Sequence, residues 1–130
     1  MNFDNFKIKA QQALQQAIDR AQQNGQQAIT PVHLLAGVLA VGENVTQFVF
    51  GKMGVNEHAL QAAVNSELQR QPRVSGGGSP YLDQEANEVV TRAQSIASKG
   101  GDSYVGLEPM LQALLEVKST ASQMMKDRKS

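Results

Sequence analysis

The sequence contains no cysteine and no tryptophan, and it has only four phenylalanines and two tyrosines among 130 residues. The absence of cysteine excludes disulfides and thiolate metal sites, and it is typical of a reducing compartment. Because aromatic residues make up only 5%, the core has to be built mainly from Leu, Val, Ile, Ala and Met. The length predicts one domain, or two small subdomains that share a core.

Long apolar runs are also missing, since none approaches the roughly 18 residues that a membrane span requires. The first six residues have neither the basic start nor the apolar stretch of a signal peptide. Twelve basic residues balance twelve acidic ones, which argues against a nucleic-acid interface, because such interfaces usually show a basic excess. We therefore expect a soluble cytoplasmic domain that binds neither nucleic acid nor membrane.

Sequence motifs for catalysis are absent as well. The string nearest to a phosphate-binding loop is Gly51-Lys52, but Thr46 stands at the leading glycine position and Met53 at the Ser/Thr position. His33 and His58 lack the paired motif of a zinc site, and no serine has a nucleophile-elbow context. The sequence predicts no enzyme, no metal and no cofactor in this domain. A noncontiguous site that gathers a histidine with carboxylates is a less favoured alternative.

The most informative stretch present is residues 29–39. Thr30 is a good helix N-cap, and Pro31 then falls at the first helical position, where its missing N–H costs nothing. Leucines and valines follow at helical spacing. The same pattern returns 76 residues later, in residues 105–115. The chain is therefore interpreted as two copies of one helical unit.

Apolar residues at helical spacing, cap residues and glycine stops predict seven helices. Four span about 4–24, 30–42, 44–54 and 56–70. The fifth spans about 83–99, and the sixth and seventh begin near residues 107 and 120. The predicted N-caps after Thr30 are Asn44, Asn56, Asp83 and Thr120. In the third helix, the side chains expected to face inward are Val45, Phe48, Val49 and Met53. We expect the segment from about Ala121 to be the least stable, since undocked ends fray.

A segment with two prolines and three glycines, residues 71–80, separates the two copies as a linker. Repeat one then covers 1–70 and repeat two covers 81–130. Aligning 1–54 with 77–130 gives eight identities, and the order of caps, helix lengths and glycine stops also matches. The second copy lacks a counterpart of the fourth helix. The predicted fold class is all-α, with two pseudo-repeated four-helix motifs, the second truncated, packed as one compact domain.

Stretches 6–21, 29–39 and 102–115 resemble the N-terminal domain of the Clp/Hsp100 unfoldases, and 43–46 and 72–77 are most similar to its ClpB-type disaggregases. The resemblance implies a noncatalytic domain tethered before ATPase rings, in a hexameric parent that uses ATP and magnesium. It implies binding of unfolded or aggregated polypeptides through an apolar groove near the first and sixth helices. The alternative is docking of adaptors or degrons, as in ClpA- and ClpC-type unfoldases. The isolated domain is expected to be a monomer.

The resemblance also implies a set of substrate-binding residues, carried over by position. They are Phe6, Leu14, Val90, Asp102, Tyr104, Glu108 and Pro109. The sequence departs from the family pattern where Val32 replaces a glutamate, Pro109 replaces a histidine, and Lys7 stands at a frequent threonine position. ClpC-like domains use two glutamates to recognise phosphoarginine, and the loss of one argues against that activity here.

Overall fold

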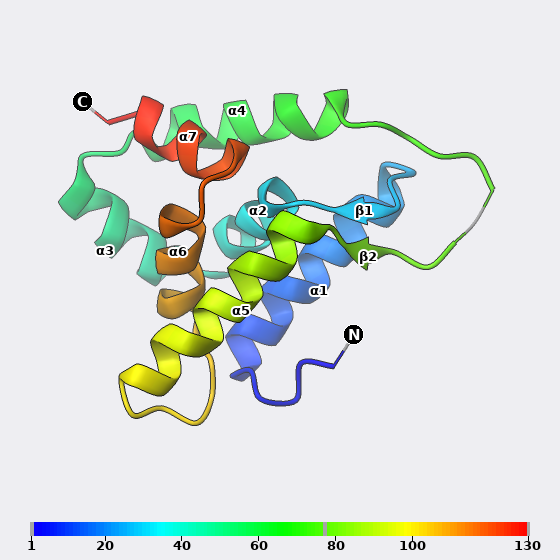
Figure 1. The fold of residues 1–130 in the computed structure, drawn as a ribbon. Helices are drawn as coiled ribbons and strands as arrows, with labels where there is room; N and C mark the ends of the chain where they lie inside the picture. The colour runs from blue at the N-terminus through cyan, green and yellow to red at the C-terminus, as the bar shows by residue number, and fades with distance from the viewer. Residues whose placement is uncertain (1, 77, 130) are drawn as a thin grey trace.

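The structure is a computed structural model, and it describes residues 2–76 and 78–129. The fold is all-α, as predicted, with two very short strands added (Figure 1). The first half contains α1 (Ile8–Gln23), β1 (Ala28–Ile29), α2 (Pro31–Val41), α3 (Glu43–Met53) and α4 (Glu57–Arg70). The second half contains β2 (Tyr81–Leu82), α5 (Gln84–Lys99), α6 (Leu107–Glu116) and α7 (Thr120–Asp127).

The two halves exchange backbone contacts in a reciprocal way. Ile29 of the first half pairs with Leu82 of the second in the parallel β1–β2 ladder, and Phe6 pairs with Val105 in an isolated parallel bridge. The Lys7 N–H donates to the Val105 carbonyl at 2.8 Å, and the Asp83 N–H donates to the Ile29 carbonyl at 2.9 Å. Adding 76 to the residue number of the first-half partner and subtracting 76 from that of the second-half partner converts the Phe6–Val105 contact into the Leu82–Ile29 contact. The repeats are therefore related by an approximate two-fold axis.

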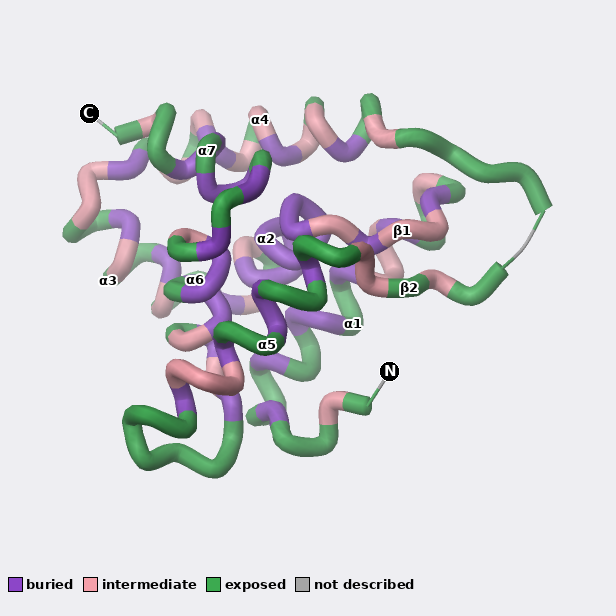
Figure 2. Tube along the Cα trace, viewed as in Figure 1, coloured by how far each residue is buried: buried purple, intermediate pink, exposed green. Residues whose placement is uncertain are grey.

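The helix α2 occupies the centre of the molecule and is buried along most of its length (Figure 2). It packs against α1, α3, α4, α5, α6 and α7. Its approach to α1 is close, because a Cβ on Gly37 would lie 2.0 Å from the Ala13 carbonyl oxygen. Within the described residues no single helix is long and apolar enough to cross a membrane, although α2 and α3, bent by 110°, pass that test as a pair.

Three of the five predicted N-caps are confirmed. The side chains of Thr30, Asn56 and Asp83 each accept a hydrogen bond from the backbone N–H three residues further on. The other two N-caps lie earlier than predicted: Gly42 stands two residues before Asn44, and Ser119 stands one residue before Thr120. The first helix starts at Ile8 rather than near residue 4, because Asp4 and Asn5 form a turn and the chain then pairs with Val105 in an extended conformation.

The prediction that Phe48 faces inward is wrong. This side chain is 57% exposed, whereas Val45, Val49 and Met53 are half-buried against the core. Part of its ring contacts Lys52, whose Nζ lies 4.5 Å from the ring centroid. The divisions at 70 and 81 stay predictions. Gly77 of the predicted linker lies outside the described residues, and Val74 and Tyr81 on either side of it are exposed.

The helix α7 is docked rather than loose, because Ala121 and Met125 are fully buried and the helix packs against α2, α4 and α6. The Asn56 N–H also donates to the Arg128 carbonyl at 2.9 Å. We therefore expect the amides of Met124 and Met125 to exchange with solvent as slowly as those of the other packed helices. Hydrogen exchange followed by NMR measures this directly. Exchange at the rate of an unstructured peptide would instead support the fraying expected from the sequence.

A candidate binding groove between α1, α5 and α6

A surface groove lies where the start of α1, the end of α5 and the start of α6 meet. Its volume is about 870 Å³. Two features of the chain form it: the extended segment before α1, which pairs with Val105, and the loop that carries the chain from α5 to α6. The residues that line it are Lys7, Ile8, Lys9, Val45, Ile96, Ala97, Gly100, Asp102, Gly106, Leu107, Glu108, Pro109 and Gln112.

The walls of the groove are mainly apolar. Leu107 and Ala97 are buried, and Val45 and Ile96 are half-buried and pack on the core. Ile8 differs from these, because 73% of its side chain is exposed at the first turn of α1. A large aliphatic side chain that is left in water beside an apolar groove favours burial against a partner.

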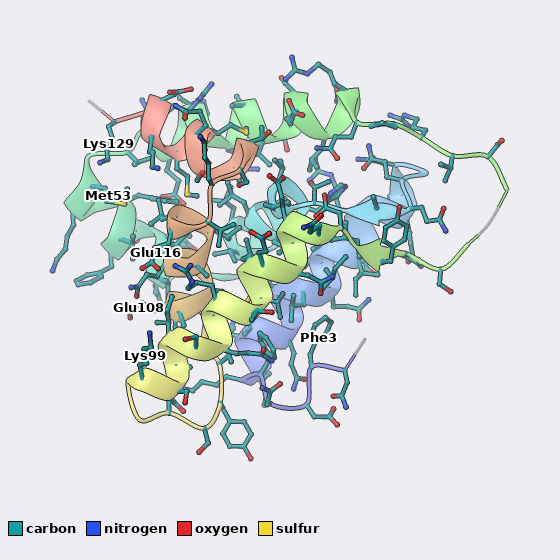
Figure 3. The ribbon with its side chains drawn as sticks, in the orientation of Figure 1. Phe3, Met53, Lys99, Glu108, Glu116 and Lys129 are labelled. Carbon is teal, nitrogen blue, oxygen red and sulfur yellow. The ribbon has the colours of Figure 1, made fainter. Side chains whose placement is uncertain are left out.

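Charged groups stand around the apolar walls. Lys7 Nζ lies 2.8 Å from an Asp102 carboxylate oxygen, and both side chains are about half exposed. The Lys7 hydrogen bond, followed by one from the Tyr104 N–H at 3.0 Å, lowers the pKa of Asp102 below its ordinary value. Glu108 stands exposed in the first turn of α6, and Figure 3 shows it on the same side of the molecule as Lys99 at the end of α5. The rim can therefore offer charges of both signs to a peptide.

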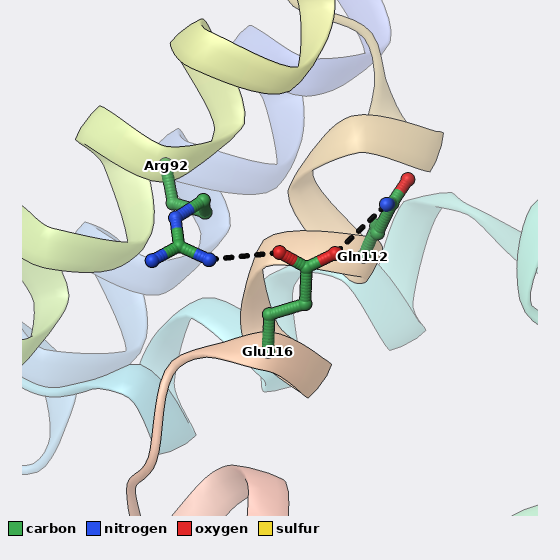
Figure 4. Close-up of polar contacts among 3 residues, drawn as sticks. All are labelled: Arg92, Gln112 and Glu116. Atoms are coloured by element: carbon green, nitrogen blue, oxygen red, sulfur yellow. Dashed lines mark hydrogen bonds and ion pairs between the residues drawn. The ribbon is translucent and has the colours of Figure 1, made fainter.

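A polar cluster fixes α6 against α5 next to the groove (Figure 4). Arg92 of α5 and Gln112 of α6 both donate to the Glu116 carboxylate, each at 2.8 Å. The Gln112 hydrogen bond, followed by the Arg92 hydrogen bond, lowers the pKa of Glu116 below its ordinary value. Because Gln112 also lines the groove, this cluster fixes the position of one polar side chain of the groove lining.

The seven predicted binding residues fall into three groups. Asp102, Glu108 and Pro109 line the groove. Tyr104 is 55% exposed and lies in the loop before α6, but it is not among the lining residues. The other three, Phe6, Leu14 and Val90, are buried in the core and do not line the groove. Contact of any of the seven with substrate stays a prediction.

Sequence reasoning missed Ile8, the most exposed large apolar side chain described. A signal for it was present in the sequence. The buried stripe of α1 contains Ala10, Ala13, Leu14 and Ala17, and Ile8 falls outside that spacing among polar residues. An isolated isoleucine on the polar face of an amphipathic helix does not point into the domain core. Such a residue is therefore a candidate for contact with a partner.

The site offers recognition chemistry, namely apolar walls with a mixed-charge rim. The part of the chain that the structure describes contains no group of three or more His, Asp or Glu side chains able to hold a metal ion. His33 is fully buried, and its ring is engaged by Thr30 and Gln26. His33 therefore contributes to the packing of α2, away from the groove.

The model of the Clp repeat N-terminal domain matches residues 5–128, so this chain belongs to that family. Among curated relatives, the chaperone protein ClpB of Bacteroides thetaiotaomicron is 50% identical over 127 residues, and that of Porphyromonas gingivalis is 44% identical. Each alignment covers 98% of this chain but only 15% of the relative, so the chain spans a small part of their length. By sequence, the chain is similar to the N-terminal region of these ClpB chaperones.

Solved structures show the same fold. The N-terminal domain of Hsp104 from Candida albicans matches with a TM-score of 0.86, covering 98% of this chain and 84% of that one. The N-terminal domain of the ClpV1 ATPase from E. coli matches with a TM-score of 0.75, covering 95% and 83%. Sequence identities are 22% and 24%, so these two comparisons support the fold alone.

Proposed function

We propose that this domain binds segments of unfolded or aggregated polypeptide in the groove between α1, α5 and α6. The single observation that carries the proposal is the combination of an open apolar groove with the exposed side chain of Ile8 on its wall. An unfolded chain differs from a folded one in displaying apolar side chains and unpaired backbone groups. An apolar groove of this size selects for such side chains without requiring a particular sequence.

The charged rim supports the same proposal. Lys7, Lys9, Asp102 and Glu108 surround the apolar walls, so a bound chain meets both donors and acceptors. Exposed ion pairs contribute little to affinity, and they orient the bound chain more than they strengthen its binding. Weak and general binding of this kind suits a domain that transfers its substrate. We propose that the ATPase rings expected in the full-length protein take the polypeptide from it, and that ATP, magnesium and hexamer formation belong to those rings.

The test is an NMR titration of the domain with a casein as a permanently unfolded polypeptide. We expect chemical-shift changes at Ile8, Ile96 and Leu107. Replacing Ile8 with aspartate places a charge on the apolar wall, and we expect affinity to fall by about tenfold or more, as for a central apolar contact. Since Ile8 is exposed, the variant should fold normally. Val74→Asp is the matched control, because Val74 is 50% exposed and lies outside the groove.

Equal loss of affinity in the Ile8→Asp and Val74→Asp variants would show that the groove is not the binding site. Shift changes confined to residues outside the groove would contradict the proposal in the same way. A third result distinguishes the alternative function. If casein causes no shift changes while a folded adaptor protein perturbs the groove residues, the domain docks adaptors and does not bind unfolded chains.

A further inference from the structure

The backbone around Val105 has one paired edge and one open edge. The Val105 N–H donates to the Asn5 carbonyl at 2.9 Å, and the Val105 carbonyl accepts from the Lys7 N–H at 2.8 Å. In a trans peptide unit the C=O and the N–H point in opposite directions, and no described peptide bond is cis. The Tyr104 carbonyl and the Gly106 N–H therefore point away from the segment that precedes α1.

These two groups have no hydrogen-bond partner within residues 2–76 and 78–129. Gly106 lines the groove and has an extended backbone, and the loop of residues 100–104 before it is exposed at the surface (Figure 2). One free donor and one free acceptor on either side of a paired residue are what the edge of a β-sheet presents. We call these two groups, with Val105 between them, the Tyr104–Gly106 edge.

The first repeat closes the donor that is equivalent to the Gly106 N–H. Subtracting 76 from the residue numbers places Thr30 at Gly106 and His33 at Pro109. The Thr30 N–H donates to His33 Nδ1 at 3.0 Å as part of a capping box. A proline side chain has no atom that accepts a hydrogen bond, and the start of α6 as described has no side-chain cap. The proline therefore leaves this donor open in the second repeat, beside the groove.

The charges of the groove suit a neutral ligand at this edge. Lys7 and Asp102 pair with each other at 2.8 Å, which leaves one further charge of each sign among the lining residues. A simple anion would satisfy only the Gly106 N–H, and a cation only the Tyr104 carbonyl. A polypeptide backbone is neutral and offers the complement of both, an acceptor for Gly106 and a donor for Tyr104.

We propose that the Tyr104–Gly106 edge binds the backbone of an extended segment of substrate, which adds a third strand outside the Phe6–Val105 pair. This inference rests on the proposed function of the groove and specifies how the polypeptide is held there. Main-chain hydrogen bonds hold any sequence, and the apolar walls take the side chains that project into the groove. The ligand is an extended chain, because a helix has already used most of its own backbone groups.

The first test compares two substitutions of Gly106 in the casein titration. Gly106→Pro removes the N–H and puts a ring carbon in its place, and we expect it to weaken casein binding by about tenfold. This N–H lies before α6 and has no described partner, so the proline breaks no hydrogen bond of the fold. Gly106→Ala is the matched control, because it keeps the N–H. Its added Cβ would lie 3.3 Å from Cδ of the flexible Lys7 side chain, and its affinity should equal that of the parent.

The second measurement uses the unaltered domain, so it does not depend on how the proline variant folds. NMR exchange with water gives the rate at single amides with and without casein. We expect the Gly106 amide to exchange about tenfold or more slowly in the complex, since its N–H is then bonded. The Ser75 amide is the control, because Ser75 is exposed and lies outside the groove. Its rate should not change.

The outcomes separate this inference from the proposed function. If casein shifts the signals of Ile8 and Leu107 while the Gly106 amide keeps its unbound exchange rate, the groove holds the chain by side chains alone and pairing at the edge is wrong. Equal affinities of the Gly106→Pro and Gly106→Ala proteins would overturn the pairing in the same way. If casein shifts no groove residue at all, the proposed function fails and this inference fails with it.

Discussion

Replacing Gly37 with alanine is expected to destabilise the domain severely, by about 3 kcal/mol or more, as for overpacking that the backbone has to absorb. The added Cβ would lie 2.0 Å from the Ala13 carbonyl oxygen and 2.9 Å from its carbon. Neither atom belongs to a side chain that can rotate away, so α1 and α2 have to separate. Urea denaturation of the two proteins measures the difference in free energy of unfolding.

The matched control is Gly51→Ala in α3. A Cβ at Gly51 meets nothing within 4 Å, and alanine is the better residue inside a helix. We therefore expect this second substitution to stabilise the domain by roughly 0.5–1 kcal/mol. The contrast separates a steric effect at the α1–α2 crossing from a general response to adding a methyl group. A Gly37→Ala protein as stable as the parent would mean that the helices do not approach as closely as described.

The second large effect is expected on acidification and centres on His33. The ring is fully buried, and its Nδ1 accepts from the Thr30 N–H at 3.0 Å. Its Nε2 therefore donates to Gln26 Oε1 at 2.7 Å, and the Gln26 amide donates to the Leu68 carbonyl at 2.6 Å. This buried network connects α2 to the end of α4. It requires the neutral ring, because a proton on Nδ1 would face the Thr30 N–H.

Burial, and secondarily the positive charge of Arg20, lower the pKa of His33 from 6.5 to about 4. Between these values the unfolded chain binds a proton at His33 and the folded chain does not. The free energy of unfolding therefore falls as the pH decreases from about 6.5 to about 4, by a total of about 3 kcal/mol. Above pH 6.5 this contribution is fully present and constant.

Urea denaturation at a series of pH values between 7 and 4 measures this dependence. His33→Gln is the control, since glutamine at this helix position can still complete the capping box with Thr30 but does not titrate. Its free energy of unfolding should be lower at pH 7 and should depend less on pH across the same range. If the parent and the variant had the same slope, the proton uptake would come from other groups.

The sequence predicts those parts of the fold that depend on local chemistry. Thr30 and Pro31 define the start of α2 because a cap and a first-turn proline act within four residues. The repeat is visible because it preserves such signals at a fixed spacing. Pairing of Phe6 with Val105 was not predicted, since residues about a hundred positions apart carry no local sign of their contact. For the same reason, the start of α1 was placed too early.

The candidate site was predicted less completely. Exposure depends on which elements pack together, so Phe48 was assigned to the core from its spacing although its surface is open. Phe6 and Leu14 were carried over as contact residues, and both are buried in the core. Asp102 and Glu108, which were carried over from the family resemblance, flank the start of α6 and line the groove. Their contact with substrate remains a prediction.

The reciprocal pairing of Phe6 with Val105 and Leu82 with Ile29 has a consequence for the origin of the domain. In a symmetric dimer, residue i of one subunit meets residue j of the other, and j meets i in return. This single chain has that geometry between its own halves. An ancestral polypeptide of half the length would form the same contacts between two separate molecules, and gene duplication with fusion would then join them through the glycine-rich segment.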